Sequence, residues 1–71
     1  MNLTVNGKSA SINGKDTMNV TSLLEELQVP QREYVTVELN GAIIDRDNFD
    51  EAAVRDGDAI EFLYFMGGGA H

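Results

Sequence analysis

The sequence predicts an α+β fold, in which strands from two hairpins and a final strand pack against one helix. Two Asn-Gly pairs, Asn6-Gly7 and Asn40-Gly41, each lie between alternating apolar and polar residues, which is a strong short-range signal of a β-hairpin. An apolar stripe at helical spacing lies between the hairpins. The predicted order is therefore strand, strand, helix, strand, strand and terminal strand.

The first hairpin begins with Leu3 and Val5, which alternate with polar neighbours. Asn6-Gly7 provides the tight turn, because both of its residues accept a positive φ. The second strand is predicted over residues 8–12, and the next turn signal, Asn13-Gly14, ends it.

One amphipathic helix is predicted over residues 20–27. Asn19 stands directly before it and reads as its N-cap. Pro30 prevents the helix from continuing, because proline lacks the backbone N–H and clashes with the preceding turn. Four apolar side chains recur at helical spacing on one face: Val20, Leu23, Leu24 and Leu27.

The second hairpin starts at residues 34–39, where apolar and polar residues alternate, and turns at Asn40-Gly41 into residues 42–44. Thr36 and Glu38 share one face of its first strand. The opposite face carries Val35, Val37 and Leu39.

The second half continues through an acidic, irregular stretch over residues 45–54, in which Phe49 and Val54 are the expected anchors. The run Asp56-Gly57-Asp58 then turns the chain into a last strand over residues 59–66. We expect a domain over residues 1–66 and a flexible tail over residues 67–71, Gly-Gly-Gly-Ala-His, because such a segment has almost no side chains to pack.

The length and composition of the chain exclude several classes of function. A chain of 71 residues holds one modest core and leaves no room for a second domain or a deep enzymatic cleft. Twelve acidic and five basic residues give a net charge of −7, which phosphate backbones repel, so nucleic acid is not an expected partner. Neither a signal peptide nor a run of about 20 apolar residues is present, so we expect a soluble, cytoplasmic protein that does not contact a membrane.

Short runs of acidic residues can bind calcium, so we compare them with the pattern of an EF-hand loop. An EF-hand loop starting at Asp45 would place Phe49 where a ligand is required and Asp50 where the turn glycine is required. The acidic residues are therefore expected to be a solvated loop, and no metal site is predicted.

The last strand predicts an exposed apolar face. Glu61 cannot be buried without a partner, so its face of the strand points away from the helix. By alternation Leu63 and Phe65 share that outward face, next to the glycines. Exposed apolar patches often mark interfaces. The alternatives that a loop covers these side chains, or that they are ordinary scattered surface residues, stay open.

With these features together, the chain resembles the ThiS family of sulfur carriers along nearly its whole length. The resemblance implies a β-grasp, or ubiquitin-like, fold: a mixed five-stranded sheet in the order 2-1-5-3-4, with the main helix across one face. The segments that carry it are Val5-Asn6-Gly7, residues 20–27, Val37-Glu38-Leu39-Asn40-Gly41, Ile44-Asp45-Arg46, Asp56 to Glu61 and the terminal glycines.

The resemblance also implies the chemistry. A ThiF-like adenylyltransferase would use ATP to adenylate the carboxylate of Gly69, a sulfur donor such as a cysteine desulfurase would convert it to a thiocarboxylate, and a ThiG-like thiazole synthase would receive the sulfur. The chain would be a carrier that the enzymes act on, itself neither an enzyme nor the holder of a bound cofactor. The implied reactive end is Gly68 and Gly69, and the partner-binding residues are expected to be Glu38, Glu61, Leu63, Phe65 and Gly67.

The family pattern ends at Gly-Gly, whereas this chain continues through Ala70 and His71. Either a tail-trimming peptidase removes these two residues, or His71 belongs partly to an expression tag. Other functions also remain open. They are the small subunit of molybdopterin synthase (MoaD-like), a sulfur carrier of another pathway, and a β-grasp module that binds without covalent chemistry.

An independent enzyme is disfavoured by the residues themselves. The chain has no cysteine, no Ser/His/Asp set and no phosphate-binding loop opening a helix. Its glycines follow a strand at the terminus, where they cannot form such a loop.

Overall fold

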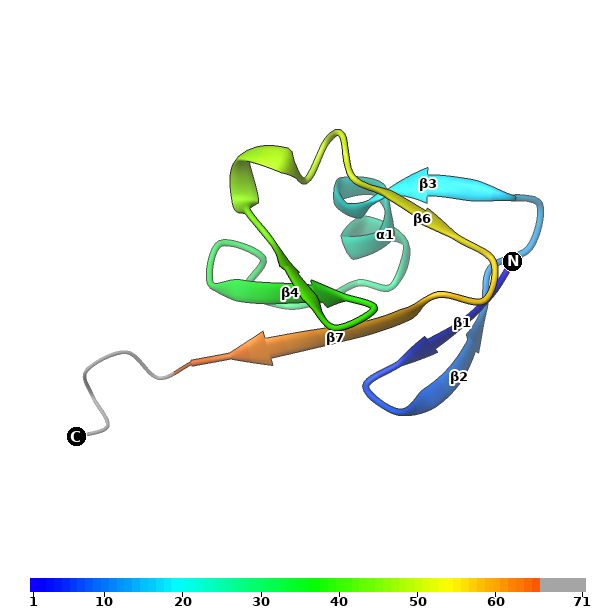
Figure 1. Cartoon of the computed structure of the whole chain (residues 1–71), viewed down its shortest axis with the longest axis horizontal. Helices are drawn as coiled ribbons and strands as arrows, with labels where there is room; N and C mark the ends of the chain where they lie inside the picture. The colour runs from blue at the N-terminus through cyan, green and yellow to red at the C-terminus, as the bar shows by residue number, and fades with distance from the viewer. Residues whose placement is uncertain (66–71) are drawn as a thin grey trace.

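The computed structural model describes residues 1–65, which form a curved mixed sheet with one helix lying across one face (Figure 1). The order of the main sheet is β2-β1-β7-β4-β5, and β3 pairs with β6 in a separate two-stranded sheet. The elements are β1 (Asn2–Val5), β2 (Lys8–Ser11), β3 (Thr17–Asn19), α1 (Val20–Glu26), β4 (Val35–Leu39), β5 (Ala42–Ile44), the 3₁₀ turn η1 (Arg46–Asn48), β6 (Ala53–Arg55) and β7 (Ala59–Tyr64).

The first and last strands lie in the centre of the main sheet. β1 and β7 run parallel, with Val5 beside Ile60, while every other pair of neighbours in this sheet is antiparallel. The parallel pair brings the two ends of the described chain into adjacent strands. The predicted α+β class, strand order and β-grasp arrangement are therefore confirmed.

Both Asn-Gly turns form as predicted. Asn6 and Gly7 have φ of 50° and 82°, and Asn40 and Gly41 have φ of 52° and 88°. Positive φ at both central residues gives the turn a twist that matches the strands on either side. The two turns are therefore specified by local sequence.

Helix α1 begins where the sequence indicates. The Asn19 side chain accepts a hydrogen bond from the Ser22 N–H at 2.7 Å, which satisfies one of the free donors of the first turn. The helix ends at Glu26, one residue earlier than predicted, with Leu27 as its C-cap and Gln28 in the left-handed region. Pro30 thus follows a helix that has already ended.

The acidic stretch is more ordered than predicted. Its residues form η1 and β6, and β6 pairs with β3 in a register that places Met18 beside Val54. Phe49 and Val54 are buried, so their predicted role as anchors is confirmed. The sequence pattern did not reveal β3 or β6, because three-residue strands show too little alternation.

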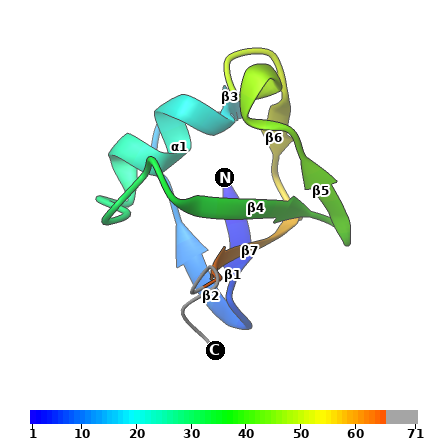
Figure 2. The same ribbon diagram turned by 90° about the vertical axis from the view of Figure 1, so that its left-hand side faces the viewer.

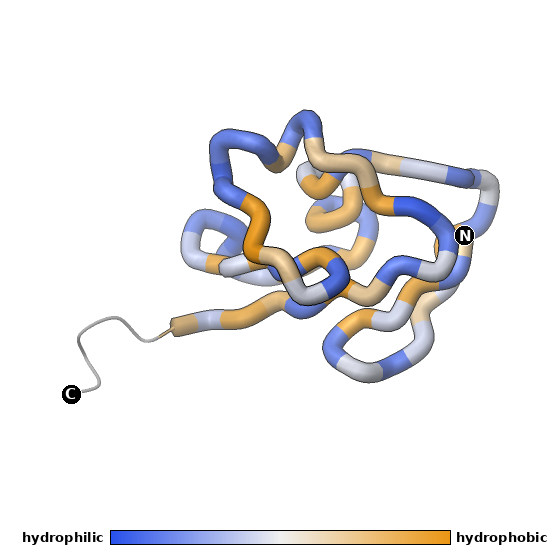
Figure 3. Tube along the Cα trace, in the orientation of Figure 1, coloured by the Kyte–Doolittle hydropathy of each residue, from blue (hydrophilic) through white to orange (hydrophobic). Residues whose placement is uncertain are grey.

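The core lies between the main sheet and α1, where most of the strongly apolar segments of the chain converge (Figure 3). Six side chains are almost wholly inaccessible to solvent: Leu23, Ile60, Val20, Val35, Val37 and Val54. Within residues 1–65, no helix is long and apolar enough to cross a membrane.

The last strand is shorter than predicted. β7 ends at Tyr64, which pairs with Val35 at the start of β4, and Phe65 lies beyond the strand. Among residues 1–65, the pairing of β7 with β4 ends at Tyr64, and Phe65 follows this last pair. Met66, the predicted last residue of both strand and domain, lies outside the described residues.

Candidate functional site

One face of the main sheet carries α1, and the other face has no described helix over it (Figure 2). We call the uncovered side the outer face. On β7 the inward residues are Ile60 and Phe62, both buried, so alternation places Glu61 and Leu63 on the outer face, as predicted. On β4 the same argument places Thr36 and Glu38 there, because Val35 and Val37 are buried.

Most of the large apolar side chains that the described residues expose lie near the end of β7. Phe65 has 69% of its surface exposed, and Tyr34, which precedes the Val35–Tyr64 pair at the same end of the sheet, has 71%. Leu63 is half-buried beside Thr36, so it offers less surface than the prediction implied. We call Tyr34, Leu63 and Phe65 the outer patch. Exposed aromatic side chains in such a cluster favour an interface.

Glu38 and Glu61 lie directly opposite each other on neighbouring strands of this face. Like charges in this arrangement repel and destabilise a sheet. In the described part of the chain, no basic side chain comes within salt-bridge distance of either glutamate. The pair therefore adds a negative charge next to the outer patch without a stabilising counter-charge from residues 1–65.

Two exposed apolar residues were not singled out from the sequence. Ile43, 63% exposed, lies opposite Glu38 on the edge strand β5, and Tyr34 completes the outer patch. The register of the second hairpin would have placed Ile43 on the outer face, because Asn40-Gly41 fixes that register. The alternation predicted over residues 34–39 would likewise have placed Tyr34 on the side of Thr36 and Glu38, although the strand itself begins at Val35.

Tyr64 lies on the helix side of the sheet, as the alternation along β7 implies, but it is not buried. Its ring remains 39% exposed, and its hydroxyl donates to the Pro30 carbonyl oxygen at 2.6 Å. α1 does not extend over this end of the sheet, so the side chain closes against the loop after the helix. This loop contact could not be predicted from the alternation within β7.

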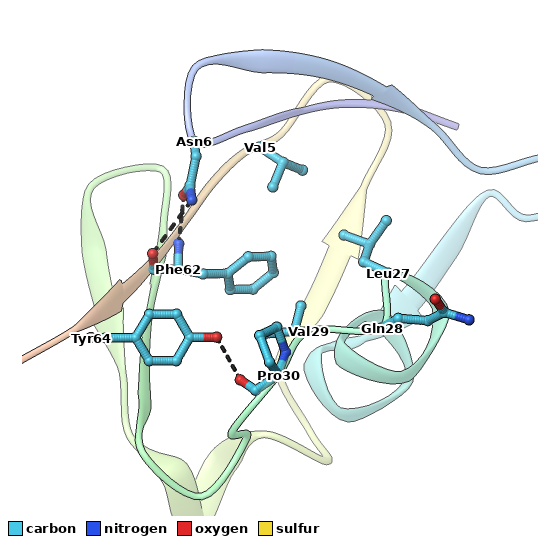
Figure 4. A pocket seen from close by; sticks show the side chains of 8 residues that line it. All are labelled: Val5, Asn6, Leu27, Gln28, Val29, Pro30, Phe62 and Tyr64. Carbon is cyan, nitrogen blue, oxygen red and sulfur yellow. Dashed lines mark hydrogen bonds between the residues drawn. The ribbon is translucent and has the colours of Figure 1, made fainter.

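A groove of about 330 Å³ opens beside Tyr64, on the helix side of the sheet (Figure 4). Its apolar walls come from Val5, Leu27, Val29 and Phe62. Its polar side chains include Asn6, whose carboxamide is hydrogen-bonded to the main chain of Phe62 (Figure 4). The groove therefore has no nucleophile with an adjacent base among its walls.

The predicted reactive residues Gly67, Gly68 and Gly69, together with Ala70 and His71, lie outside the described residues. Among residues 1–65, no group of three or more His, Cys, Asp or Glu side chains is placed to hold a metal ion. The described site is thus a surface, formed by the outer patch and the two glutamates, at the end of the strand that leads to the glycines.

Comparisons with known proteins agree on one family. The family model described as the ThiS family matches residues 3–69. The chain is 37% identical over 67 residues to the sulfur carrier protein ThiS of Bacillus subtilis, a match that covers 94% of this chain and 98% of that protein. It is 39% identical over 70 residues to a thiazole synthase of Paramagnetospirillum magneticum, which covers 99% of this chain and 21% of that enzyme. The chain thus spans about a fifth of that relative's length.

Solved structures extend the similarity to the fold. The crystal structure of the thiamine biosynthesis protein ThiS from Geobacter metallireducens superposes with a TM-score of 0.93 at 62% identity, and the match covers 97% of this chain and all of that chain. The solution structure of a thiamine biosynthesis protein from the same organism gives a TM-score of 0.78 at the same 62% identity, covering 97% of this chain and 88% of that chain.

Proposed function

The chain belongs to the ThiS family, and from this premise we propose that it is a sulfur carrier protein of thiamine biosynthesis that carries sulfur as a thiocarboxylate on Gly69. The observation that carries the proposal is that the family match runs through the glycines to residue 69. The outer patch at the end of β7 supports it, because that strand leads directly to those glycines.

The reaction needs a partner enzyme. A carboxylate oxygen of Gly69 attacks the α-phosphorus of ATP in a ThiF-like adenylyltransferase, and pyrophosphate leaves. The terminal sulfur of a donor persulfide, such as that on a cysteine desulfurase, then displaces AMP from the acyl carbon and gives an acyl disulfide. A thiol attacks the donor cysteine's sulfur in this disulfide, which releases the thiocarboxylate and leaves the thiol and the donor cysteine joined as a disulfide. The carrier contributes the carboxylate and no catalytic side chain, which fits a chain without cysteine.

Glycines suit this task for a physical reason. Three residues in extended conformation span about 10 Å, and a segment such as Gly67 to Gly69 has no side chains that would block its entry into a narrow channel of a partner. Ordering each of them costs about 1–2 kcal/mol, so the glycines alone would bind weakly. Burying Phe65 against a partner contributes about 1.5–3 kcal/mol, which offsets much of that cost.

The outer patch and the two glutamates indicate what kind of surface the partner must present to bind here. An apolar surface covers Tyr34, Leu63 and Phe65, while basic side chains of the adenylyltransferase face Glu38 and Glu61. A ThiG-like thiazole synthase receives the sulfur, and the similarity to a thiazole synthase supports this acceptor. Because adenylation consumes ATP, we place the carrier and its partners in the cytoplasm.

Ala70 and His71 follow Gly69 in this sequence. A free carboxylate exists at Gly69 only when the Gly69–Ala70 peptide bond has been hydrolysed, so a trimming peptidase precedes adenylation in this scheme. The glycine-sized channel of the adenylating enzyme would exclude the side chains of both residues.

Complementation tests the proposed function. In a bacterial strain that lacks its own thiamine sulfur carrier, the chain ending at Gly69 should restore growth without thiamine, and Gly69→Val should not. A strain lacking the small subunit of molybdopterin synthase serves as the control, and it should stay deficient. Rescue of the control strain alone would contradict the proposal in favour of a MoaD-like role.

A further inference from the structure

The side chain of Asn6 continues the pairing of β1 beyond the end of that strand. The last β1–β7 pair is Val5 beside Ile60, and the Asn6 N–H donates to the Ile60 carbonyl oxygen at 2.9 Å. Past that point, Asn6 Oδ1 accepts a hydrogen bond from the Phe62 N–H at 2.8 Å, and its Nδ2 donates to the Phe62 carbonyl oxygen at 3.5 Å. The carboxamide thus takes the place that another strand residue would hold (Figure 4).

The turn itself does not require asparagine at this position. Glycine adopts the φ of 50° found at Asn6 without steric cost, so the carboxamide has a task separate from the turn. Asn40 does the equivalent at the opposite end of β7: its Oδ1 accepts from the Ala59 N–H at 2.9 Å. The chain therefore offers a matched pair of asparagines, one at each end of the same strand.

Asn6 is the last described group that holds β7 on the β1 side. Backbone groups alternate in direction along a strand, so those of Tyr64 point the same way as those of Ile60 and Phe62. No hydrogen bond from another described residue reaches the Tyr64 backbone on that side. Without the carboxamide, the described hydrogen bonds to the β7 backbone after Ile60 come from β4 alone.

We propose that Asn6 is a positioning residue for sulfur transfer: it fixes the direction in which β7 leaves the sheet, so that the outer patch and the glycines engage the adenylating partner together. The proposal rests on the proposed function. Without the Asn6 carboxamide, the end of β7 has more conformational freedom, and binding to the partner must remove it. The entropic cost of this ordering weakens the affinity for the partner, while the chemistry at Gly69 is unchanged.

Hydrogen exchange tests the local step without any partner. In Asn6→Gly, the Phe62 amide should exchange about tenfold faster than the loss of global stability explains, since one net hydrogen bond is worth about that factor. Asn40→Gly is the control, and after the same correction it should leave Phe62 unchanged. Asn6→Asp keeps the acceptor oxygen and should restore most of the Phe62 protection. Equal protection of Phe62 in wild type and Asn6→Gly would overturn the proposal.

Steady-state kinetics test the functional step, using chains that end at Gly69, a ThiF-like enzyme, ATP and a sulfur donor. Asn6→Gly should raise KM for the carrier by about tenfold with kcat within about twofold, because the lost order is restored at binding. Asn40→Gly should leave KM near the wild-type value. Equal KM values in the two glycine variants would overturn the positioning role. If the wild-type chain forms no thiocarboxylate, the proposed function itself is wrong. The hydrogen-exchange experiment would still decide, without any partner, whether Asn6 orders β7.

Discussion

Three asparagines terminate elements of this fold through their side chains. Asn19 caps α1, while Asn6 and Asn40 hold the two ends of β7. Asparagine suits these positions because it carries both an acceptor and a donor on a short side chain, and at Asn6 and Asn40 it also tolerates the left-handed backbone. Single side chains thereby hold the strand that leads to the glycines, at Ala59 where it begins and at Phe62 near its end.

The helix cap gives a prediction at the residue scale. Asn19→Ala should lower the free energy of unfolding by about 1 kcal/mol, because the Ser22 N–H loses its acceptor. Denaturant unfolding measures this difference as a shift in midpoint at constant slope. Asn19→Asp is the control, since its carboxylate still accepts from Ser22. A full-sized loss in the aspartate variant would assign the effect to the Asn19 Nδ2 bond with the Asp50 carbonyl oxygen instead.

Local signals made some residues predictable and left others hidden. The turn asparagines and the cap of α1 follow from short sequence patterns, because their backbone geometry is decided within four residues. Arg46 had no such pattern. Its guanidinium donates to the carbonyl oxygens of Arg32 at 2.6 Å and Val35 at 2.8 Å, and it lies 5.2 Å from the centre of the Phe49 ring. These contacts join segments that only the tertiary fold brings together.

At the scale of elements, β7 is the strand on which the functional account depends. Its buried residues secure it to the core, while its outer residues and Phe65 are available to a partner. The sequence predicted which residues of β7 point inward and which point outward. That prediction needed only the alternation along the strand and the position of Glu61, which had to face solvent. It did not predict that Leu63 is half-buried, because that coverage depends on neighbours across the sheet.

The outer patch gives a prediction at this scale. Replacing Leu63 and Phe65 together by serine should weaken binding to a ThiF-like partner by at least about tenfold, since Phe65 alone contributes about 1.5–3 kcal/mol when buried. Isothermal titration calorimetry measures the affinity, and circular dichroism checks that the variant is folded.

Ile43→Ser provides the matched control, because it removes an equally exposed apolar side chain two strands away from β7. Its affinity should stay within about threefold of wild type. Unchanged affinity in the folded double variant would remove the outer patch from the interface.

The small sheet of β3 and β6 shows what the sequence could not predict among the elements. Its strands are three residues each, and they pair segments more than thirty residues apart in the chain. Neither periodicity nor a turn signal identifies such a pair. The main sheet was predictable because two hairpins set their own registers and the family resemblance supplied the order.

At the scale of the whole molecule, we expect charge to govern the encounter with the proposed adenylating partner. The net charge of −7 is spread over the chain, but Glu38 and Glu61 concentrate part of it beside the outer patch. A partner with basic side chains around its binding surface is attracted from a distance, and this attraction is screened by salt.

Association with the adenylating partner should therefore slow as ionic strength rises from about 0.05 to about 0.5 M. Stopped-flow fluorescence measures the association rate. Changing both Glu38 and Glu61 to glutamine should flatten the salt dependence more than the same change at Glu26 and Glu51, which alters the net charge equally away from the outer patch. An association rate indifferent to salt in the wild-type chain would exclude the proposed basic surface.

The central claim is that Gly69 carries the sulfur, and intact mass spectrometry tests it most directly. The chain ending at Gly69 is incubated with a ThiF-like enzyme, ATP and a sulfur donor, beside a chain ending at Gly68 and the full chain ending at His71. The account predicts a gain of about 16 Da on the first chain, as sulfur replaces one carboxyl oxygen. Little product should form on the second, whose reach is shorter by about 3.5 Å, and none on the third. Sulfur acquired as readily by the full chain as by the chain ending at Gly69 would contradict the account.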